Sequence, residues 1–294
     1  MKIAILGAGG RLGAALARAW SASDEVLAFA RADLDLGLPG EVDRVLGPPA
    51  FDVLVNCAAL TNVDYCETHE EEALRINAGA VREIGALCVR KQARCIHIST
   101  DYVFDGASAR PYVETDPARA ISVYGESKLR GEQALFETSA GHLAVRVSWV
   151  FGPDRPSFVD GILKRALEAD TAEAIGDKWS APSFTLDLAA MLRPLLRDIP
   201  CGGLLHASNS GGCTWREYGE HALECAARAG IPVKTTEVKF LPIAGMKAFV
   251  ARRPVYTVLS PEKLAGLTGA APRAWQAAVE DYVTHWIAPR FARA

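Results

Sequence analysis

Short apolar segments alternate with longer stretches of helical periodicity through the first half of the chain. The short segments are nearly continuous in Val, Ile, Leu and Ala, and they fall at residues 3–6, 26–30, 53–58, 95–99 and 143–148. Strands that are covered on both faces have this composition, which is typical of a parallel sheet. Helix-length stretches lie between them, at residues 11–21, 70–91 and 125–138. The alternation predicts an α/β fold with a doubly wound parallel sheet, whose ligands bind at the carboxyl ends of the strands.

The amino-acid composition limits the classes of molecule that we expect the protein to bind. Half of the 294 residues are hydrophobic and 23% are charged, as in an ordinary globular protein. The 32 Lys and Arg residues are balanced by 35 Asp and Glu residues, so the net charge of -3 gives no basic footprint for nucleic acid or an anionic membrane. No apolar run approaches the roughly 18 residues of a membrane span. We therefore expect a cytoplasmic protein with neither nucleic acid nor membrane as a partner.

A glycine-rich stretch follows the first predicted strand, with the sequence Gly7-Ala8-Gly9-Gly10-Arg11-Leu12-Gly13. Gly7, Gly10 and Gly13 have the spacing that lets a backbone turn tightly from a strand into a helix. The amides at that helix N-terminus then face a pyrophosphate, whose charge the helix dipole favours. The motif alone is weak evidence, but its strand–turn–helix context favours a Rossmann-like dinucleotide site.

The second half of the chain is less regular. Helical patterns at residues 158–169, 186–197 and 215–229 are interrupted by segments that contain Pro and Gly. We predict an NAD(P)-binding domain over residues 1–152 and a smaller, mainly substrate-binding region over residues 153–294. The boundary is soft, because strands from later in the chain can return to the main sheet.

Arg31 lies at the end of the second predicted strand, where the adenosine ribose of a dinucleotide is bound. An acidic residue there binds a ribose 2′-hydroxyl, whereas a basic residue accommodates a 2′-phosphate. Arg31 therefore favours NADPH. Asp33 and Asp35 follow closely, which leaves NADH open as a cofactor, and Arg31 could also be a solvated residue at a strand end.

Tyr124 and Lys128 form a Tyr-x-x-x-Lys pair, which places both side chains on one face of a helix. A free tyrosine hydroxyl has a pKa near 10 and is a poor acid–base catalyst at neutral pH. A nearby ammonium would lower that pKa and suit the phenol to exchange a proton with a ketone or an alcohol. A surface tyrosine stacked on a lysine stem is the alternative interpretation. Thr100, at the end of a buried strand, could hydrogen-bond the substrate oxygen beside Tyr124.

Several motifs occur together along the chain. They are Ser-Thr-Asp-Tyr-Val-Phe-Asp-Gly at residues 99–106, Glu-Thr-Asp at 114–116, Tyr-Gly-Glu-Ser-Lys at 124–128 and Arg-Val-Ser-Trp-Val-Phe at 146–151. In this order they resemble the dTDP-4-dehydrorhamnose reductase family of extended short-chain dehydrogenase/reductases. Matching segments reach from residue 1 to about 286. Cys57 and the stretch 154–157 depart from the family pattern, and the latter puts the exact sugar in doubt.

The resemblance implies roles for individual residues. It implies that Thr100, Tyr124 and Lys128 are catalytic. It implies that the cofactor is bound by the catalytic Tyr124 and Lys128 together with a further set of residues. These are Gly7, Gly10, Arg11, Leu12, Gly13, Arg31, Asp35, Leu36, Ala58, Ala59 and Thr61. On the sugar-nucleotide side it implies Tyr102 and Trp149, with Arg252 as a candidate for the substrate diphosphate.

We therefore expect an oxidoreductase that takes hydride from NADPH to the C4 ketone of a dTDP-4-keto-6-deoxy-sugar, as in dTDP-L-rhamnose biosynthesis. A related epimerase or reductase of another nucleotide sugar is one alternative. The second is an NADP-binding regulatory subunit, such as the β subunit of methionine adenosyltransferase, which resembles the same family. The seven cysteines and six histidines show neither a Cys-x-x-Cys pair nor a metal-binding motif, so no metal site is predicted. A homodimer is left open.

Overall fold

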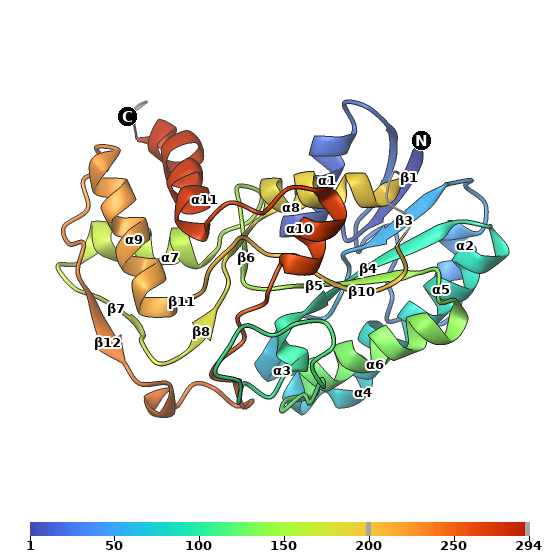
Figure 1. Ribbon diagram of the computed structural model, residues 1–294, viewed down its shortest axis with the longest axis horizontal. Coiled ribbons are helices and arrows are strands. Elements are labelled where there is room, and N and C mark those ends of the chain that lie inside the picture. Colours follow the sequence, from blue (N-terminus) through green and yellow to red (C-terminus); the bar gives the residue numbers. More distant parts are fainter. Residues whose placement is uncertain (198–200, 292–294) are drawn as a thin grey trace.

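A six-stranded sheet forms the centre of the larger part of the molecule in the computed structural model, which describes residues 1–197 and 201–291 (Figure 1). The strand order is β10-β5-β4-β3-β1-β2, and every neighbouring pair is parallel. The predicted doubly wound parallel sheet is confirmed. The strands are β1 (Lys2–Leu6), β2 (Glu25–Phe29), β3 (Val53–Asn56), β4 (Arg94–Thr100), β5 (Leu143–Val147) and β10 (Gly203–His206).

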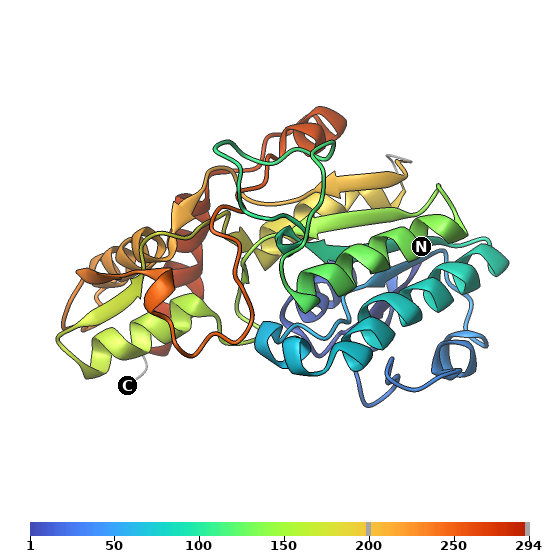
Figure 2. The ribbon, with the colours of Figure 1, turned by 90° about the horizontal axis from the view of Figure 1, so that it is seen from below.

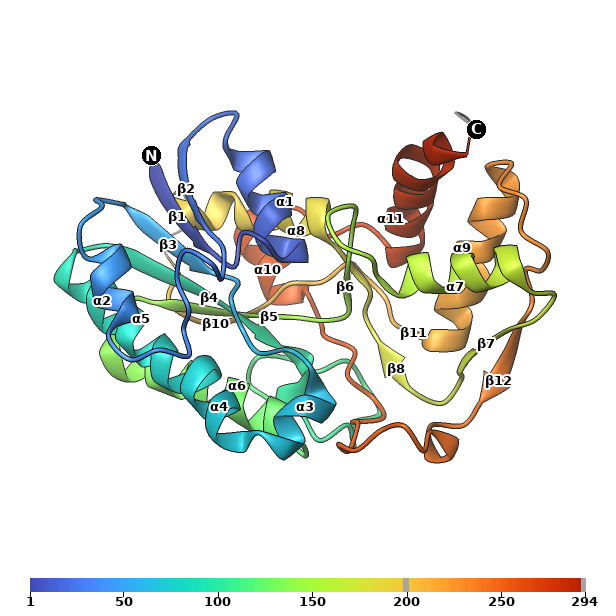
Figure 3. The ribbon, with the colours of Figure 1, turned by 180° about the vertical axis from the view of Figure 1, so that it is seen from behind.

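Helices cover both faces of this sheet (Figures 1 and 3). Alternate side chains of β1 enter separate cores: Ile3 and Ile5 pack on one face, Ala4 and Leu6 on the other. This follows from the two-residue period of a strand. The first face is covered by α1 (Arg11–Trp20), α8 (Thr185–Leu192) and α10 (Glu262–Thr268), and the second by α2 (Glu41–Leu46), α5 (Ala80–Arg90) and α6 (Val123–Thr138). In Figure 2, α5 and α6 run side by side beneath the sheet.

The stretch at 70–91 was expected as one helix and is divided in the structure. It consists of α4 (Glu70–Leu74), a π-helical turn η1 (Arg75–Gly79) and α5. The buried Asn77 lies in this turn, and its side chain accepts the N–H of Leu60 at 2.8 Å and donates to the Leu60 carbonyl and to Ser127. Such single π turns are frequent at functional sites. Here the turn fixes the loop after β3 against α6.

The second half of the chain contributes to both parts of the molecule. Strand β10 returns to the main sheet beside β5, and α8 and α10 pack on that sheet. The smaller part has its own core among α7 (Phe158–Glu168), α9 (Trp215–Arg228) and α11 (Trp275–Tyr282). Its strands are β7 (Ala172–Ile175) with β12 (Val238–Leu241), and β8 (Trp179–Ser180) with β11 (Cys213–Thr214). The domain boundary near residue 152 remains a prediction.

Short elements complete the described residues. Strand β6 (Val150–Phe151) pairs with β9 (Ser183–Phe184) between the two parts, and α3 (Val63–Thr68) flanks the main sheet. The short helical turns are η2 (Asp101–Val103), η3 (Pro194–Leu196), η4 (Ile243–Gly245), η5 (Val283–Ile287) and η6 (Ala288–Arg290). No helix among residues 1–197 and 201–291 has the length and apolarity that a membrane crossing requires. All seven cysteines are free thiols, five of them buried.

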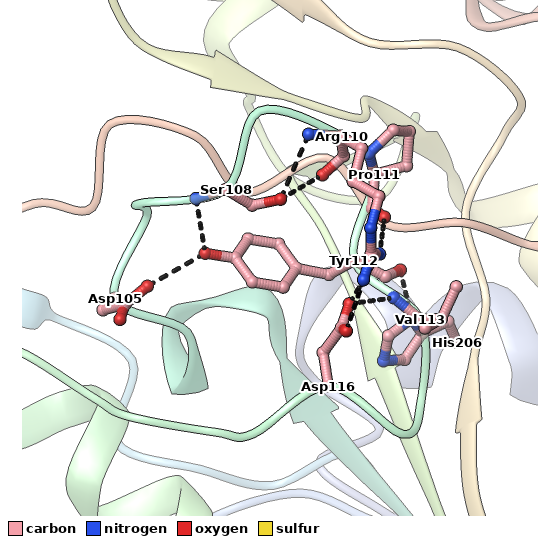
Figure 4. A network of polar contacts seen from close by, with 8 residues as sticks. All are labelled: Asp105, Ser108, Arg110, Pro111, Tyr112, Val113, Asp116 and His206. Atoms are coloured by element: carbon pink, nitrogen blue, oxygen red, sulfur yellow. Dashed lines mark hydrogen bonds and ion pairs between the residues drawn. The ribbon is translucent and has the colours of Figure 1, made fainter.

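Polar contacts fold the long connection between β4 and α6 (Figure 4). The Tyr112 hydroxyl donates to Asp105 at 3.0 Å, and the Tyr112 carbonyl lies 3.1 Å from Nδ1 of His206 on β10. Asp116 accepts two hydrogen bonds from Arg110, at 2.9 and 2.7 Å. These contacts tie the connection to the sheet, so that the end of β4, which carries Thr100, is held in place.

Candidate active site

A cavity of about 740 Å³ opens at the carboxyl ends of the sheet strands. Its lining includes the last residues of β1, β2, β4 and β5 and the loop after β3. The lining includes Arg31, Asp35 and Leu36 after β2, and also Trp149 after β5 and Lys128 on α6. This is the position at which doubly wound sheets bind their ligands. The cavity brings together residues that lie more than 100 positions apart in the sequence.

The glycine loop has the conformation that a phosphate cradle requires. Gly7 has a φ of +74°, and a Cβ there would lie 2.8 Å from the backbone nitrogen of Ala58. Gly7, Gly10 and Leu12 line the cavity. Gly13 does not: a Cβ at this position would clash with the carbonyl oxygen of Gly7, so its role is to let α1 approach the loop. The first-turn N–H groups of α1 lack intrahelical acceptors and are available for an anion.

Arg11 lines the cavity, but its guanidinium is engaged by backbone. It donates to the carbonyls of Val150 at 3.1 Å, Arg155 at 3.3 Å and Pro156. The side chain therefore holds the segment 150–156 against α1. The cofactor contact that the resemblance implies for Arg11 remains a prediction, and the guanidinium is already engaged elsewhere.

Residues after β2, where we expect the adenosine of a dinucleotide, line part of the cavity. The Arg31 side chain is 75% exposed, and its Nε lies 3.5 Å from a carboxylate oxygen of Asp35. An ion pair this exposed contributes little to stability, so Arg31 can turn toward a ligand phosphate at small cost. Leu36 is buried and forms part of the cavity wall.

The loop after β3 contributes Ala58, Ala59 and Thr61 to the lining. The side chain of Asn56 accepts the N–H of Ala58 at 3.0 Å, and its amide lies 3.1 Å from Nδ1 of His97. Sequence reasoning did not single out Asn56, His97 or Asn77. Because all three act through long-range contacts, no local pattern pointed to them.

Thr100 and Tyr124 are brought together by β4 and α6. Helix α6 begins after Ser122, whose hydroxyl accepts the N–H of Gly125 at 3.2 Å. A Cβ at Gly125 would clash with the carbonyl of Tyr102, so glycine lets α6 dock directly against the end of β4. Both hydroxyl-bearing residues line the cavity.

The pKa of Tyr124 moves in the direction opposite to the one expected from the Tyr-x-x-x-Lys spacing. Burial raises the pKa of its hydroxyl, and the negative charge of Asp101 adds to the effect, while the hydrogen bond with Thr100 opposes it. The predicted lowering by Lys128 was wrong for this structure. The phenol therefore carries its proton at neutral pH and can donate it.

Lys128 is fully buried behind Tyr124. Its Nζ donates to the carbonyl of Ile98 at 2.7 Å and lies 3.0 Å from Nε2 of His97. Burial lowers the pKa of Lys128 to about 8, against the opposing charge of Glu132. The ammonium at the cavity wall is thus poised to lose its proton in the mildly alkaline range.

Two aromatic residues line the part of the cavity near Tyr124. The ring of Tyr102 meets that of Tyr124 edge-on, with centroids 5.7 Å apart. Trp149 has a φ of +43°, a strained conformation for a residue with a Cβ, and packs on Tyr218 with centroids 4.7 Å apart. Strain of this kind is concentrated at functional sites, where surrounding packing maintains it.

Arg252 is exposed and does not line the cavity, so its contact with a substrate diphosphate remains a prediction. The neighbouring Arg253 is the arginine that turns inward, and its guanidinium donates to Asp64 on α3 at 2.7 Å. Asp64 also accepts the N–H groups of Val250 and Ala251, each at 2.9 Å. Asp64 therefore ties the segment 250–253 to the helix beside the cavity.

Lys178 is a buried charge that sequence reasoning missed. Its Nζ donates to the carbonyl of Pro254 at 2.8 Å and lies 5.1 Å from the centre of the Tyr102 ring. Asp101 supplies the opposing negative charge and accepts hydrogen bonds from Ser148 and Thr100. A lysine is almost never fully buried without a partner. The groups that accompany Lys178 lie far away in the sequence, so no local sequence pattern indicated its burial. Within the described residues, no group of three or more His, Cys, Asp and Glu side chains is placed to hold a metal ion.

A family model described as the RmlD substrate binding domain matches residues 1–287 of the chain. The chain belongs to this family. Among its relatives, the dTDP-4-dehydrorhamnose reductase of Burkholderia thailandensis is 33% identical over 290 residues, covering 95% of this chain and 97% of the relative. The family resemblance inferred from the motifs at 99–106 and 124–128 is confirmed.

Solved structures of RmlD-family proteins have the same architecture. A dTDP-4-dehydrorhamnose reductase from Clostridium acetobutylicum matches with a TM-score of 0.88 and 30% identity, covering 96% of this chain and 98% of that one. A second, from Bacillus anthracis and solved in complex with NADP, matches with a TM-score of 0.87 and 27% identity, covering the same shares. The similarity to these solved structures therefore covers both the larger and the smaller part of the molecule.

Proposed function

We propose that this RmlD-family chain is an NADPH-dependent reductase of the C4 ketone of a dTDP-4-keto-6-deoxy-sugar, converting dTDP-4-dehydrorhamnose to dTDP-L-rhamnose. The observation that carries the proposal is that Thr100, Tyr124 and Lys128 line the same cavity as the glycine loop. Relatives that match nearly the whole chain are named as dTDP-4-dehydrorhamnose reductases, and one was solved with NADP. The substrate is accordingly a nucleotide sugar.

The residues present fit a dinucleotide. Gly7 and Gly10 leave the backbone of the loop open to a pyrophosphate, and the first turn of α1 supplies unpaired N–H groups. Arg31 would hold the adenosine ribose phosphate, and Ala58 and Ala59 would line the path toward Lys128. When bound, NADPH supplies the hydride for the carbonyl carbon.

The chain's own residues would donate the proton that the reduction of the ketone requires. Reduction of a ketone creates negative charge on its oxygen, and a general acid within hydrogen-bond reach must neutralise that charge. Tyr124 fits this role because its side chain lines the cavity and its hydroxyl carries a proton at neutral pH. Thr100 would hold the carbonyl oxygen beside it, and the Lys128 ammonium would bind the nicotinamide ribose, as the family resemblance implies. Tyr102 and Trp149 would shield the sugar from water.

A coupled assay tests this function directly. The ketosugar dTDP-4-keto-6-deoxy-L-mannose is generated in situ by the upstream dehydratase and epimerase, and NADPH oxidation is followed by absorbance. We expect turnover that requires the epimerised sugar and that is slower with NADH. Omitting the epimerase is the matched control. Absence of turnover by a chain that still binds NADPH would reject this substrate and favour a regulatory role or another nucleotide sugar. Stoichiometric NAD retained through purification would instead favour an epimerase.

The pH dependence of this reaction reports on Lys128. Its ammonium is present below a pKa of about 8 and is lost above it. We therefore expect kcat/KM to fall by about tenfold per pH unit above that value, since kcat/KM reports the ionisations of the free enzyme. Tyr124 does not set this limb, because its pKa is raised. In Lys128→Arg, where the charge persists, the limb should move to higher pH. A wild-type profile that stays flat to about pH 10 would exclude a requirement for the ammonium.

A further inference from the structure

The segment between β6 and α7 crosses the glycine loop and places an arginine on it. The Nε of Arg155 donates to the carbonyl oxygen of Gly9 at 2.9 Å, and the side chain lines the same cavity as Arg31. Residues 154–157 are the stretch that departs from the family pattern. Arg155 is thus a cation contributed to the cofactor end of the cavity from a segment that lies 146 residues away from Gly9 in sequence.

The surroundings of Gly9 show where the Arg155 guanidinium lies. A Cβ on Gly9 would have only two non-neighbouring groups close to it, the Ala30 side chain at 3.6 Å and the Arg155 guanidinium at 3.9 Å. Ala30 immediately precedes Arg31 at the end of β2. The guanidinium of Arg155 therefore covers the loop beside the position at which a 2′-phosphate would be read.

Arg155 is positioned by a braced segment. Arg11 donates to three backbone carbonyls of residues 150–156, and Arg18 on α1 pairs with Asp154 through both of its terminal nitrogens. Because Asp154 is committed to Arg18, it does not neutralise its neighbour Arg155. The segment presents one guanidinium to the cavity and anchors the rest of its polar groups to α1.

The side chains around Arg31 carry a net negative charge, so a second arginine changes the charge that a bound phosphate would meet. The positive Arg31 is accompanied by Asp35 at 3.5 Å and by Asp33, whose carboxylate accepts the N–H of Ala30 at 2.8 Å. These three side chains sum to one net negative charge, which would repel a phosphate. Arg155 brings the local sum to zero and adds guanidinium donors, the geometry best suited to phosphate oxygens.

We propose that Arg155 and Arg31 together bind the 2′-phosphate of NADPH, and that Arg155 decides the preference for NADPH over NADH. The inference rests on the proposed function, which supplies the dinucleotide. Asp33 and Asp35 beside Arg31 left the choice between NADPH and NADH open, and a second arginine would decide it in favour of NADPH. A contact with the pyrophosphate, which both cofactors share, is the competing assignment, and the experiment separates the two.

The test measures binding and needs no turnover. Dissociation constants of the purified full chain for NADP⁺ and NAD⁺ are determined by titration calorimetry for the wild type and Arg155→Gln. A charge-assisted hydrogen bond to phosphate is among the stronger polar contacts, so we expect the Kd of NADP⁺ to rise by about tenfold to a hundredfold. The Kd of NAD⁺ should stay within about twofold, which also shows that the glycine loop is intact. Arg165→Gln, an exposed arginine of α7 outside the cavity lining, is the matched control and should change neither value.

Three outcomes would overturn the assignment. An equal rise for both nucleotides would place Arg155 on the pyrophosphate. Unchanged binding of NADP⁺ by Arg155→Gln would make it a surface residue, with the proposed function untouched. If the wild-type chain bound neither nucleotide, the proposed function would itself fail. Arg155→Lys adds a check on geometry, because a lysine that keeps the charge should restore only part of the NADP⁺ affinity.

Discussion

Replacing Tyr124 with Phe should lower turnover by about 10²–10⁴-fold, the range lost when a general acid is removed. Phe keeps the ring that packs edge-on against Tyr102 and removes only the hydroxyl. Lys128 is held by the Ile98 carbonyl and by His97, so it is not free to replace the lost hydroxyl. The affinity for NADPH should be nearly unchanged, because the phosphate contacts lie at the other end of the cavity.

Single-turnover measurements of NADPH oxidation separate this chemical step from binding and product release. Tyr65→Phe is the matched control, since its exposed hydroxyl donates to Glu72 at 2.9 Å and it does not line the cavity. It should retain the wild-type rate. Near-normal turnover of Tyr124→Phe would remove Tyr124 from the chemistry and leave Thr100 or a solvent molecule as the proton donor.

Features specified by nearby residues could be predicted from the sequence. The five strand segments of the first half and the turn from β1 into α1 depend on local periodicity and on glycines that relieve local clashes. Gly13 illustrates this, because a Cβ there would clash with the backbone of Gly7, six residues earlier in the chain. The clustering of Thr100 with Tyr124 followed from the rule that ligands bind at the carboxyl ends of parallel strands.

Features set by contacts between distant residues could not be predicted in this way. The π turn that interrupts the expected helix at 70–91 depends on Asn77 reaching Leu60 and Ser127. Lys178 is buried because a segment 76 residues further along supplies the carbonyl of Pro254. Arg252 and Arg253 are neighbours in sequence, and only the position of Asp64 determines which one turns inward. The raised pKa of Tyr124 likewise reflects burial, which side-chain spacing does not report.

A buried ion pair holds α6, which carries Tyr124 and Lys128, against the sheet. Arg146 on β5 donates two hydrogen bonds to Glu132 on α6, at 2.9 and 2.7 Å, and their side chains are 3% and 4% exposed. The hydroxyl of Ser99 on β4 donates to the same carboxylate at 2.5 Å. One carboxylate therefore connects the catalytic helix to both strands beneath it.

Glu132→Gln should destabilise the chain by about 3–5 kcal/mol, because the guanidinium of Arg146 would remain buried without its counter-charge. Urea unfolding, followed by fluorescence, measures the change in the free energy of unfolding. Glu126→Gln is the control on the same helix: its ion pair with Arg130 is about half exposed, so its loss should cost under about 1 kcal/mol.

The paired replacement Glu132→Met with Arg146→Met separates a requirement for charge from a requirement for packing. Removing both charges eliminates the desolvation cost of each, so this variant should be more stable than Glu132→Gln. A loss of less than about 1 kcal/mol in Glu132→Gln would mean that the buried guanidinium finds another partner or water. If the paired variant is stable but binds NADP⁺ normally with reduced turnover, the ion pair serves to align Tyr124 with Thr100 rather than to stabilise the fold.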